Sequence, residues 1–422
     1  MLVNSNKMFK FAAMKQLVVL ATLLLTTLTG MAGNKIYVEN VRSLTSVVNG
    51  DWMNRPVMEL GSGDRLRIGF DELSHDYHRF VYRLEHCEVD WTVSDDLFES
   101  DWLEGFNDNP IDNYENSVNT TVAYTHYRLQ IPNERCRLKM SGNYRVHVLD
   151  EDNDDEEVLT VEFMMTEQTM NLALSVTTNT DIDLNASHQQ VSMSLSFGKL
   201  LVTNPEDQIK TVVMQNGRNA RHDIRPNFRN ANGLEWTHNR GLIFDAGNEY
   251  HKFEVLDVSH PTMGIDIIRW DGSYYQAFPF TDEPRPNYLY DEDADGAFYI
   301  RNSDNRENDI ASDYVWVNYR LKAPALSEGK VIIDGQWTTD DNIYNYVMAY
   351  DEAEGMYHTR ILQKQGYYNY QYLWLKGDGT TALLPSEGSF FQTENRYQAY
   401  AYYKGTGDRT WRLVSYRQIE IK

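Results

Sequence analysis

The sequence is poor in cysteine, proline and positive charge, and each shortage narrows what the protein can be. It has 2 cysteines and 11 prolines in 422 residues, which excludes a small scaffold held by many disulfides and a proline-rich linker protein. Lys and Arg number 39 against 62 Asp and Glu, which gives a formal net charge of -23. Nucleic acid and anionic lipid surfaces are poor partners for a chain of this charge.

The common catalytic signatures are missing as well. The chain has no Gly-x-Ser-x-Gly elbow, no His-Glu-x-x-His zinc motif, no glycine-rich phosphate loop and no Cys-x-x-Cys pair. His86 and Cys87 are adjacent but do not form a dyad, because neighbours on a strand point to opposite faces. We therefore expect a protein that works by binding and is not an enzyme, with no cofactor and no metal.

Residues 1–32 have the pattern of an export signal. They contain a basic region with three lysines, an apolar run at 17–28 and a small-residue cleavage site at 30–32. A membrane span needs about 20 apolar residues, so we predict a cleaved signal peptide. Its loss takes the formal charge from -23 to -26, and no cysteine follows the cleavage site to carry a lipid. The mature protein should be periplasmic.

The rest of the sequence favours antiparallel sheets. Aromatic residues make up 13% of the chain, with 28 tyrosines, and no sustained helical period follows residue 32. The clearest strands are 80–91 and 125–131. In the second, Tyr127, Leu129 and Ile131 share one face. In the first, the apolar residues occupy even positions up to residue 84 and odd positions from residue 87 on. This switch predicts a β-bulge near Glu85 or His86.

A long acidic loop, residues 94–117, separates these two strands. It holds eight Asp or Glu and no Lys or Arg, yet it also carries many large apolar side chains. We expect it to fold back onto the sheet with its carboxylates facing water. It is either a structural lid over the edge of a sandwich or a partner-binding surface, since long ordered loops are often functional. The candidates for partner contact are Trp102, Phe106, Ile111 and Tyr114.

Short blocks of residues, in and beyond this region, follow one another in a specific order. They are His86-Cys87-x-x-Asp90-Trp91, Gly105-Phe106, Ile111-Asp112-x-Tyr114-x-x-Ser117, Tyr124-Thr-His-Tyr127, Leu129-x-Ile131-Pro132-Asn133, Ser141-Gly142-Asn143-Tyr144, Asn204-Pro205-Glu206-Asp207, Val213-Met214-Gln215-Asn216-Gly217, Gly247-Asn248-Glu249 and Gly366-Tyr367-Tyr368-x-Tyr370-Gln371-Tyr372. In order and spacing they resemble the plug protein family of the Bacteroidetes type IX secretion system, over most of the chain after residue 32. The resemblance implies a protein at the periplasmic mouth of a very large outer-membrane β-barrel translocon, whose channel it closes when no cargo is present. No contact residues can be carried over, because the blocks look like strand and turn determinants.

The chain length and the proline-containing junction at 282–287 predict three tandem domains. We expect an all-β protein of three immunoglobulin-like β-sandwiches, at 33–167, 168–287 and 288–422. In the third, Trp337, Tyr357 and the tyrosines of 367–372 are similar to aromatics in immunoglobulin-like domains beside glycan-active enzymes. Such side chains can stack on sugars, although they more often pack one sheet against another. A glycan-binding accessory protein is therefore the alternative function.

Three further features have two readings each. Cys87 and Cys136 would both reach an oxidising compartment, where they either pair or stay separate as buried thiols. The acidic turn 150–157 and the run Asp291-x-Asp293-x-Asp295-Gly296 partly resemble calcium loops. The twelfth position of the second is Asn302, where a calcium loop has glutamate. For both we expect ordinary acidic turns without Ca²⁺.

These expectations describe a non-enzymatic periplasmic binding protein. Its partner would be the large outer-membrane translocon barrel, through which it is held at the outer membrane. We expect no nucleic-acid partner, no direct insertion into the membrane and no small-molecule ligand.

Overall fold

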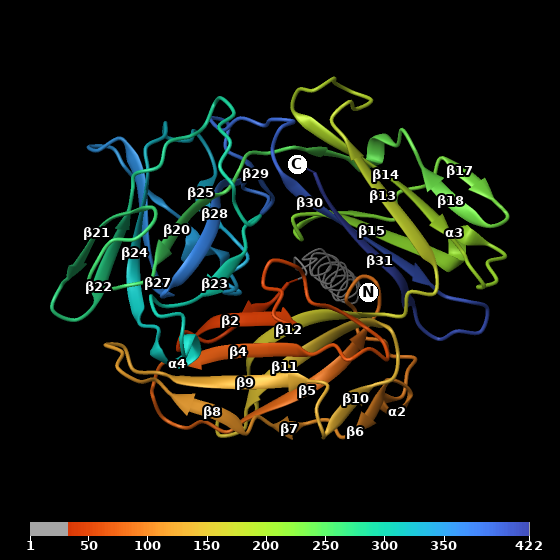
Figure 1. The fold of residues 1–422 in the computed structure, drawn as a ribbon, viewed down its shortest axis with the longest axis horizontal. Coiled ribbons are helices and arrows are strands. Elements are labelled where there is room, and N and C mark those ends of the chain that lie inside the picture. The colour runs from red at the N-terminus through yellow and green to blue at the C-terminus, as the bar shows by residue number, and fades with distance from the viewer. Residues whose placement is uncertain (1–32, 422) are drawn as a thin grey trace, which may run out of the picture. The chain divides into compact units, whose positions relative to one another are not determined.

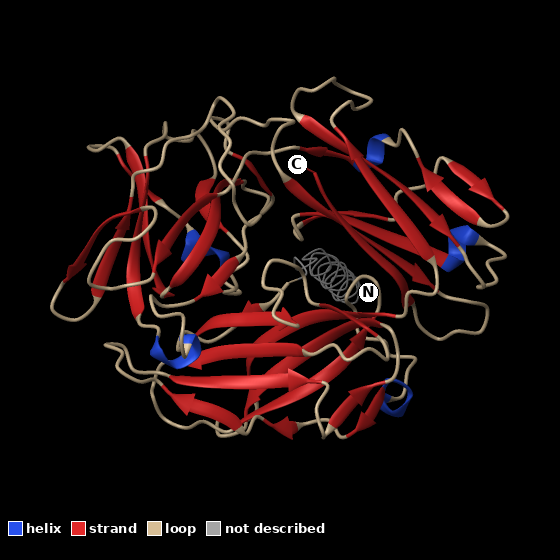
Figure 2. Ribbon diagram, viewed as in Figure 1, coloured by secondary structure: helices blue, strands red, loops and turns tan. Residues whose placement is uncertain are grey.

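The computed structural model describes residues 33–421, so the predicted export signal at 1–32 lies outside the described residues. The described chain forms three β-sandwich lobes, each with its own buried core (Figures 1 and 2). The helices are single turns between strands. The all-β prediction is confirmed. Within residues 33–421, no helix is long and apolar enough to cross a membrane.

Lobe 1 packs two sheets around one core. Its elements are β1 (Lys35–Ile36), β2 (Val41–Val48), β3 (Val57–Glu59), β4 (Leu66–Glu72), β5 (Phe80–Cys87), α2 (Glu99–Trp102), β6 (Leu103–Gly105), β7 (Asn109–Pro110), β8 (Asn113–Asn116), β9 (Thr125–Ile131), β10 (Cys136–Leu138), β11 (Gly142–Asp150) and β12 (Glu156–Thr166). One sheet has the order β1-β12-β11-β5-β7, with β3 beside β12, and the other has the order β2-β4-β9-β8. The inward face of β9 is Tyr127, Leu129 and Ile131, as its alternation predicts.

Strand β5 is shorter than the predicted strand 80–91. It pairs with β11 without irregularity from Phe80 to Cys87, so the predicted bulge is absent and that prediction is wrong. The chain then turns, and the Glu88 N–H donates to the Thr92 carbonyl at 2.7 Å. Beyond the turn, the apolar side chains do not continue the alternation of β5, because they no longer face the core of lobe 1. Val89 packs instead against strands of lobe 2.

Lobe 2 takes its strands from two separate stretches of chain. They are β13 (Asn171–Thr177), β14 (His188–Ser196), α3 (Pro205–Gln208), β15 (Ile209–Gln215), β16 (Asn219–His222), β17 (Phe228–Asn230), β18 (Gly233–Trp236), η1 (Arg240–Leu242) and β19 (Ile243–Asp245), then β30 (Asn395–Tyr403) and β31 (Arg412–Ile421). One sheet has the order β13-β14-β18-β17, with β19 beside β14, and the other has the order β16-β15-β30-β31.

The predicted boundary between residues 287 and 288 therefore does not separate two sandwiches, and the prediction of three tandem domains is wrong there. Strand β15 pairs with β30 over its whole length. Tyr397, Ala399 and Ala401 of β30 lie in the same buried core as Leu195 and Val213. Without its last two strands, the second sandwich would have one of its two sheets reduced to a hairpin and its core exposed.

Lobe 3 is inserted between β19 and β30. It comprises β20 (His251–Val255), β21 (Ile265–Trp270), β22 (Tyr275–Pro279), β23 (Phe298–Ile300), α4 (Asn308–Ala311), β24 (Tyr314–Leu321), β25 (Lys330–Asp334), η2 (Ile343–Tyr346), β26 (Ala349–Asp351), β27 (Met356–Lys364), β28 (Gly366–Leu375) and β29 (Thr381–Leu383). One sheet is centred on β28, which pairs with β20, β23, β25 and β29, and the other has the order β21-β22-β24-β27-β26.

A buried polar cluster joins lobes 1 and 3. Asp71 of β4 has no exposed surface, and its carboxylate accepts from Lys364 Nζ at 2.7 Å and from the Tyr314 hydroxyl at 2.6 Å. His126 Nδ1 lies 2.6 Å from the other carboxylate oxygen. Burial opposes ionisation of Asp71, but Lys364 and His126 outweigh it and hold its pKa below the usual range. Removing one partner from such a pair typically costs about 3–5 kcal/mol.

The other two junctions between lobes also contain packed or paired side chains. Between lobes 1 and 2, Met164 packs with Tyr400, Tyr402 and Leu413 in a cluster of buried apolar side chains. The Tyr402 hydroxyl also donates to Asn143 Oδ1 at 2.8 Å. Lobes 2 and 3 are joined by ion pairs between Arg396 and Asp295 and between Arg218 and Asp334. Each lobe is thus held to both others by buried contacts.

Candidate partner-binding surface

The acidic loop 94–117, called the lid below, is an ordered part of lobe 1. It contributes α2, β6, β7 and β8, and each of its strands pairs with a strand of the sandwich: β6 with β10, β7 with β5 and β8 with β9. The lid therefore reaches from one sheet to the other across an edge of the sandwich.

The lid is anchored by apolar side chains that point into the core. Trp102 is 6% exposed and Ile111 is 3% exposed. The Trp102 ring lies edge-on to Tyr144, with centroids 5.9 Å apart. Two of the four predicted contact residues are thus interior residues that no partner can reach without unfolding the lid.

The other two predicted residues lie at the surface, but they are not together. Phe106 is 76% exposed directly after β6, whereas Tyr114 is 42% exposed on β8. Figure 1 shows β6 and β8 at different ends of lobe 1. Tyr114 stacks at an angle against Tyr77, with ring centroids 4.7 Å apart, and Tyr77 is itself 51% exposed. Tyr77 precedes the strand 80–91 and carried no signal in the sequence.

Phe106 is held outward by the backbone beside it. Its N–H donates to the Arg135 carbonyl at 3.0 Å, and Asn109 Nδ2 donates to the Phe106 carbonyl at 2.6 Å. Gly105 has a φ of 110°, and a Cβ at this position would lie 2.0 Å from the Arg135 carbonyl oxygen. Only glycine allows this close approach of the two chains.

Phe98 is a second exposed ring on the same part of the lid, and we did not predict it as a contact residue. It is 73% exposed, and the Arg409 guanidinium lies 5.6 Å from its ring centroid. Arg409 also pairs with Asp101 at 2.6 Å, so the β30–β31 loop of lobe 2 fixes α2 in place. We call Phe98, Glu99, Glu104 and Phe106 the lid tip.

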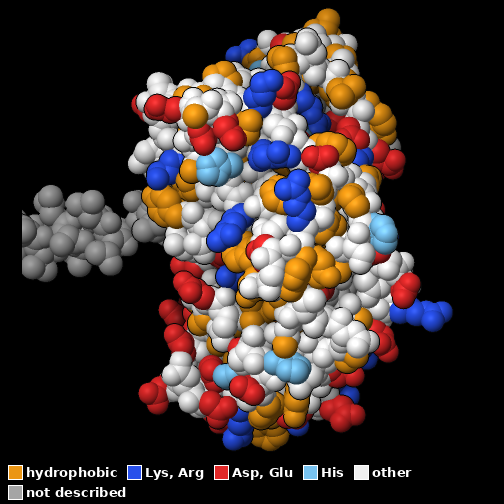
Figure 3. Space-filling model, turned by 90° about the vertical axis from the view of Figure 1, so that its left-hand side faces the viewer, with side chains coloured by type: hydrophobic (Ala, Val, Ile, Leu, Met, Phe, Trp, Pro, Cys, Tyr) orange, Lys and Arg blue, Asp and Glu red, His pale blue; other side chains and the backbone are white. Residues whose placement is uncertain are grey.

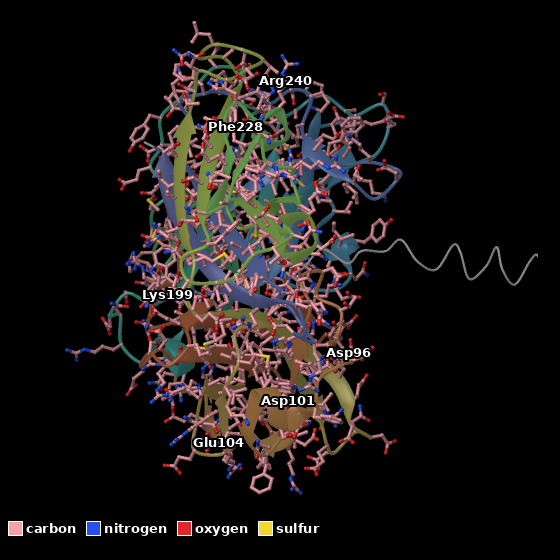
Figure 4. All side chains as sticks on the ribbon, turned by 90° about the vertical axis from the view of Figure 1, so that its right-hand side faces the viewer. Asp96, Asp101, Glu104, Lys199, Phe228 and Arg240 are labelled. Atoms are coloured by element: carbon pink, nitrogen blue, oxygen red, sulfur yellow. The ribbon has the colours of Figure 1, made fainter. Side chains whose placement is uncertain are left out.

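The carboxylates of the lid face water, as predicted. Some pair with arginines of the sandwich, such as Asp108 with Arg83 and Asp112 with Arg135, both at 2.6 Å. The pKa of Asp101 is lowered first by the Phe98 backbone N–H and then by Arg409. Figure 4 shows Asp96, Asp101 and Glu104 on one side of lobe 1. The lid tip is therefore two exposed aromatic rings in an acidic surround.

The acidic run after the 282–287 junction is not arranged as a calcium loop. Asp293 accepts hydrogen bonds from the backbone of Tyr250 and Asp295, and Asp295 pairs with Arg396 at 3.2 Å. Burial raises the pKa of Asp293 to about 6 and that of Asp295 to about 7. Within residues 33–421, no three His, Cys, Asp or Glu side chains converge as a metal site.

Two other sequence features have a structural role. Cys87 and Cys136 are separate buried thiols, and burial raises the pKa of Cys87 to about 12. Of the lobe 3 aromatics that resemble sugar-stacking residues, all but the half-buried Tyr367 lie inside its core. Trp337 is 8% exposed and donates to the Asn369 carbonyl at 2.8 Å, and Tyr370 is 2% exposed. These rings pack one sheet against the other, and sugars cannot reach them.

Comparison with known proteins finds a matching family and similar solved structures. Residues 41–167 match the family described as "Type 9 secretion system plug protein 1st domain". A crystal structure of a hypothetical protein from Parabacteroides merdae superposes with a TM-score of 0.88 at 35% identity, over 92% of this chain and 99% of that one. No curated protein matches the sequence.

Proposed function

The chain belongs to the type IX secretion system plug protein family, and from that membership we propose that it closes the periplasmic opening of the outer-membrane translocon barrel. It acts by binding, without catalysis, and it is exported to the periplasm. Family membership itself gives a role in type IX secretion and an association with components of that system in the cell envelope. Our proposal adds three things: that the protein closes the channel, that its partner is the translocon barrel, and that it binds from the periplasmic side.

The observation that carries the proposal is how firmly the three lobes are joined. A plug must keep its shape against an open pore, so its domains must not move independently. Weakly joined domains move relative to one another by default. Here the Asp71–Lys364 pair is buried between lobes 1 and 3, and Met164 and Tyr402 lie in an apolar junction between lobes 1 and 2. These contacts support a single rigid body.

The lid tip is the surface we assign to the barrel. Phe98 and Phe106 are the most exposed rings of lobe 1, and exposed aromatics are typical anchors of protein interfaces. The acidic residues around them suit a partner with basic groups and make the association weaken as salt rises. Such an interface is reversible, which a plug requires.

Affinity isolation tests the proposal. We expect the protein to co-purify with a tagged translocon barrel. We also expect a deletion strain to become sensitive to vancomycin, which an intact outer membrane excludes, while cargo export largely continues. A chain with Phe98→Ala and Phe106→Ala should co-purify poorly and fail to restore vancomycin resistance.

The control is Phe228→Ala, because Phe228 is also an exposed phenylalanine, at 59%, and lies on lobe 2 (Figure 4). This variant should behave as the unaltered chain does. If the protein is missing from the barrel complex and the deletion strain keeps its permeability barrier, plugging is wrong. If Phe228→Ala and the lid-tip variant lose binding equally, the assignment of the lid tip is wrong. Tryptophan fluorescence during sugar titration would then test the glycan-binding alternative.

A further inference from the structure

The outward face of one sheet in lobe 3 differs in charge from the rest of the chain. This sheet has the order β21-β22-β24-β27-β26. In β24, Val315, Val317 and Tyr319 point into the core of lobe 3, so the alternate residues Trp316 and Asn318 point outward. We call the outward positions of β21, β22, β24 and β27 the basic face; they are Ile267, Arg269, Gln276, Phe278, Trp316, Asn318, Arg320, His358, Arg360 and Leu362.

The basic face concentrates positive charge on a strongly acidic chain. It holds Arg269, Arg320 and Arg360 against two acidic residues, Asp266 of β21 and Asp271 of the β21–β22 turn, whose carboxylate accepts from Gln276 Nε2 at 2.8 Å. Asp266 lies at one end of the face, 3.9 Å from Arg320. The whole chain has a net charge of -23. Figure 3 shows Lys and Arg side chains gathered among hydrophobic ones in the upper part of the side from which β21, β22 and β24 are seen.

Two of these arginines lie over aromatic rings of the same face. The Arg360 guanidinium is 4.7 Å from the centroid of Trp316, and the Arg269 guanidinium is 5.9 Å from that of Phe278. Such stacking places a guanidinium over a ring face and leaves its N–H edges free. Neither arginine donates a hydrogen bond to another residue within the described chain. The edges are therefore available to a ligand that accepts them.

The same stacking decides which ligand fits. A sugar would need an open ring face on Trp316, but Arg360 covers the ring and the Tyr274 ring lies edge-on at 6.3 Å. Nucleic acid and anionic membranes would meet the acidic remainder of the chain over their whole extent. A carboxylate accepts two parallel N–H groups from one guanidinium. An open sheet face suits a protein surface, whereas small molecules bind mostly in concave pockets.

We propose that the basic face docks a protein surface that presents aspartate and glutamate side chains. The rest of this acidic chain repels such a surface, so the partner approaches through this face alone and in one orientation. The proposal does not depend on the plug function, because the basic face belongs to lobe 3 and the lid tip to lobe 1.

Binding to poly-L-glutamate tests the proposal on the full mature protein. A fluorescein-labelled poly-L-glutamate peptide should bind at low ionic strength and dissociate as NaCl rises. The double variant Arg269→Glu, Arg360→Glu should weaken this binding about tenfold or more. Arg225→Glu is the control, since Arg225 is an exposed arginine of lobe 2 whose side chain makes no hydrogen bond or ion pair to another described residue. It should bind as the unaltered protein does.

Three results would overturn the proposal. Loss of binding in Arg225→Glu, which reverses one charge where the double variant reverses two, would mean that net charge alone decides the binding. If dextran sulfate binds the basic face as tightly as poly-L-glutamate or more tightly, the ligand of this face is an anionic glycan. Self-association that the double variant abolishes would make a second copy of the chain the occupant.

A second measurement avoids substitution, in case the charge reversals disturb folding. Hydrogen–deuterium exchange of the unaltered protein with poly-L-glutamate should slow at residues 265–280 and 356–364. Protection elsewhere, with none at these strands, would contradict the proposal.

Discussion

Glu249 is a buried residue whose surroundings disfavour its negative charge. It is 4% exposed, and its carboxylate accepts from the Tyr288 hydroxyl at 2.7 Å and from the Glu394 N–H at 3.3 Å. Burial, followed by repulsion from Asp293, raises its pKa to about 7. A carboxylate whose pKa is higher in the folded state contributes stability below its unfolded pKa. That stability is lost as the pH rises through about 7.

Glu249→Gln should therefore stabilise the protein at alkaline pH. Glutamine keeps an oxygen that can accept the two hydrogen bonds and removes the buried charge. We expect Tm at pH 8 to rise by about 1–2 °C, which corresponds to about 1–2 kcal/mol in a protein of this size. At pH 5 the two chains should melt alike, because Glu249 is then protonated.

Differential scanning calorimetry at both pH values measures this. Glu352→Gln is the control, because Glu352 is an exposed residue of the turn between β26 and β27, and it should leave Tm unchanged at both. If Glu249→Gln lowers Tm at pH 8, the carboxylate is stabilised by its surroundings and the assigned pKa direction is wrong.

At the scale of elements, the lid carries both buried and exposed aromatic residues in one acidic loop. Trp102 and Phe106 are four residues apart, yet one is 6% exposed and the other 76%. The short strand β6, paired with β10 from Leu103 to Gly105, lies between them. Trp102 precedes it and points into the core, and Phe106 follows it and points to water.

Trp102→Ala should release the lid, whereas Phe106→Ala should not. Loss of a buried tryptophan typically costs about 3–5 kcal/mol, and here that loss falls on the anchor of a segment that spans two sheets. A protease specific for acidic residues measures the effect, since the lid holds eight of its sites. We expect slow cleavage of the unaltered chain and of Phe106→Ala, and rapid cleavage within 94–117 for Trp102→Ala. Rapid cleavage of the unaltered lid would show that it is not docked as described.

At the scale of the whole molecule, lobe 3 is an insertion into lobe 2. The two ends of the insertion lie side by side. The Thr393 hydroxyl donates to the Gly247 carbonyl at 2.9 Å, and Asn395 Nδ2 donates to the Ala246 carbonyl at 2.8 Å. Domain insertion is tolerated where the ends of the inserted domain are close together, as they are here.

Lobe 3 should accordingly be removable, while the C-terminal strands should not. Replacing residues 248–392 with a short glycine–serine linker should leave lobes 1 and 2 folded, as a monomer with the circular dichroism of antiparallel sheet. The fragment 33–287 should aggregate instead, because it lacks β30 and exposes the core that Tyr397 and Ala399 cover. Size-exclusion chromatography distinguishes the two. A stable, monomeric 33–287 fragment would contradict the topology.

The sequence by itself determined the strands and most of their inward faces. Alternation placed Tyr127 and Leu129 inward, because the period of two along a strand is a local property. The blocks of residues that resemble the plug family depend on local order as well, and the family match over 41–167 agrees with them. The apolar content of the acidic lid was likewise enough to predict an ordered loop.

Only the tertiary structure decided which strands pair and which side chains remain outside. Nothing local in β15 indicates a partner about 190 residues later along the chain, because one antiparallel edge pairs as readily as another of similar pattern. His126 alternates with Tyr127 along β9 and therefore lies on the outer face of its sheet, yet lobe 3 buries it together with Asp71. Trp102 and Ile111 looked as available to a partner as Phe106 does. Burial is a property of what packs on a residue, and that depends on contacts between segments far apart in the sequence.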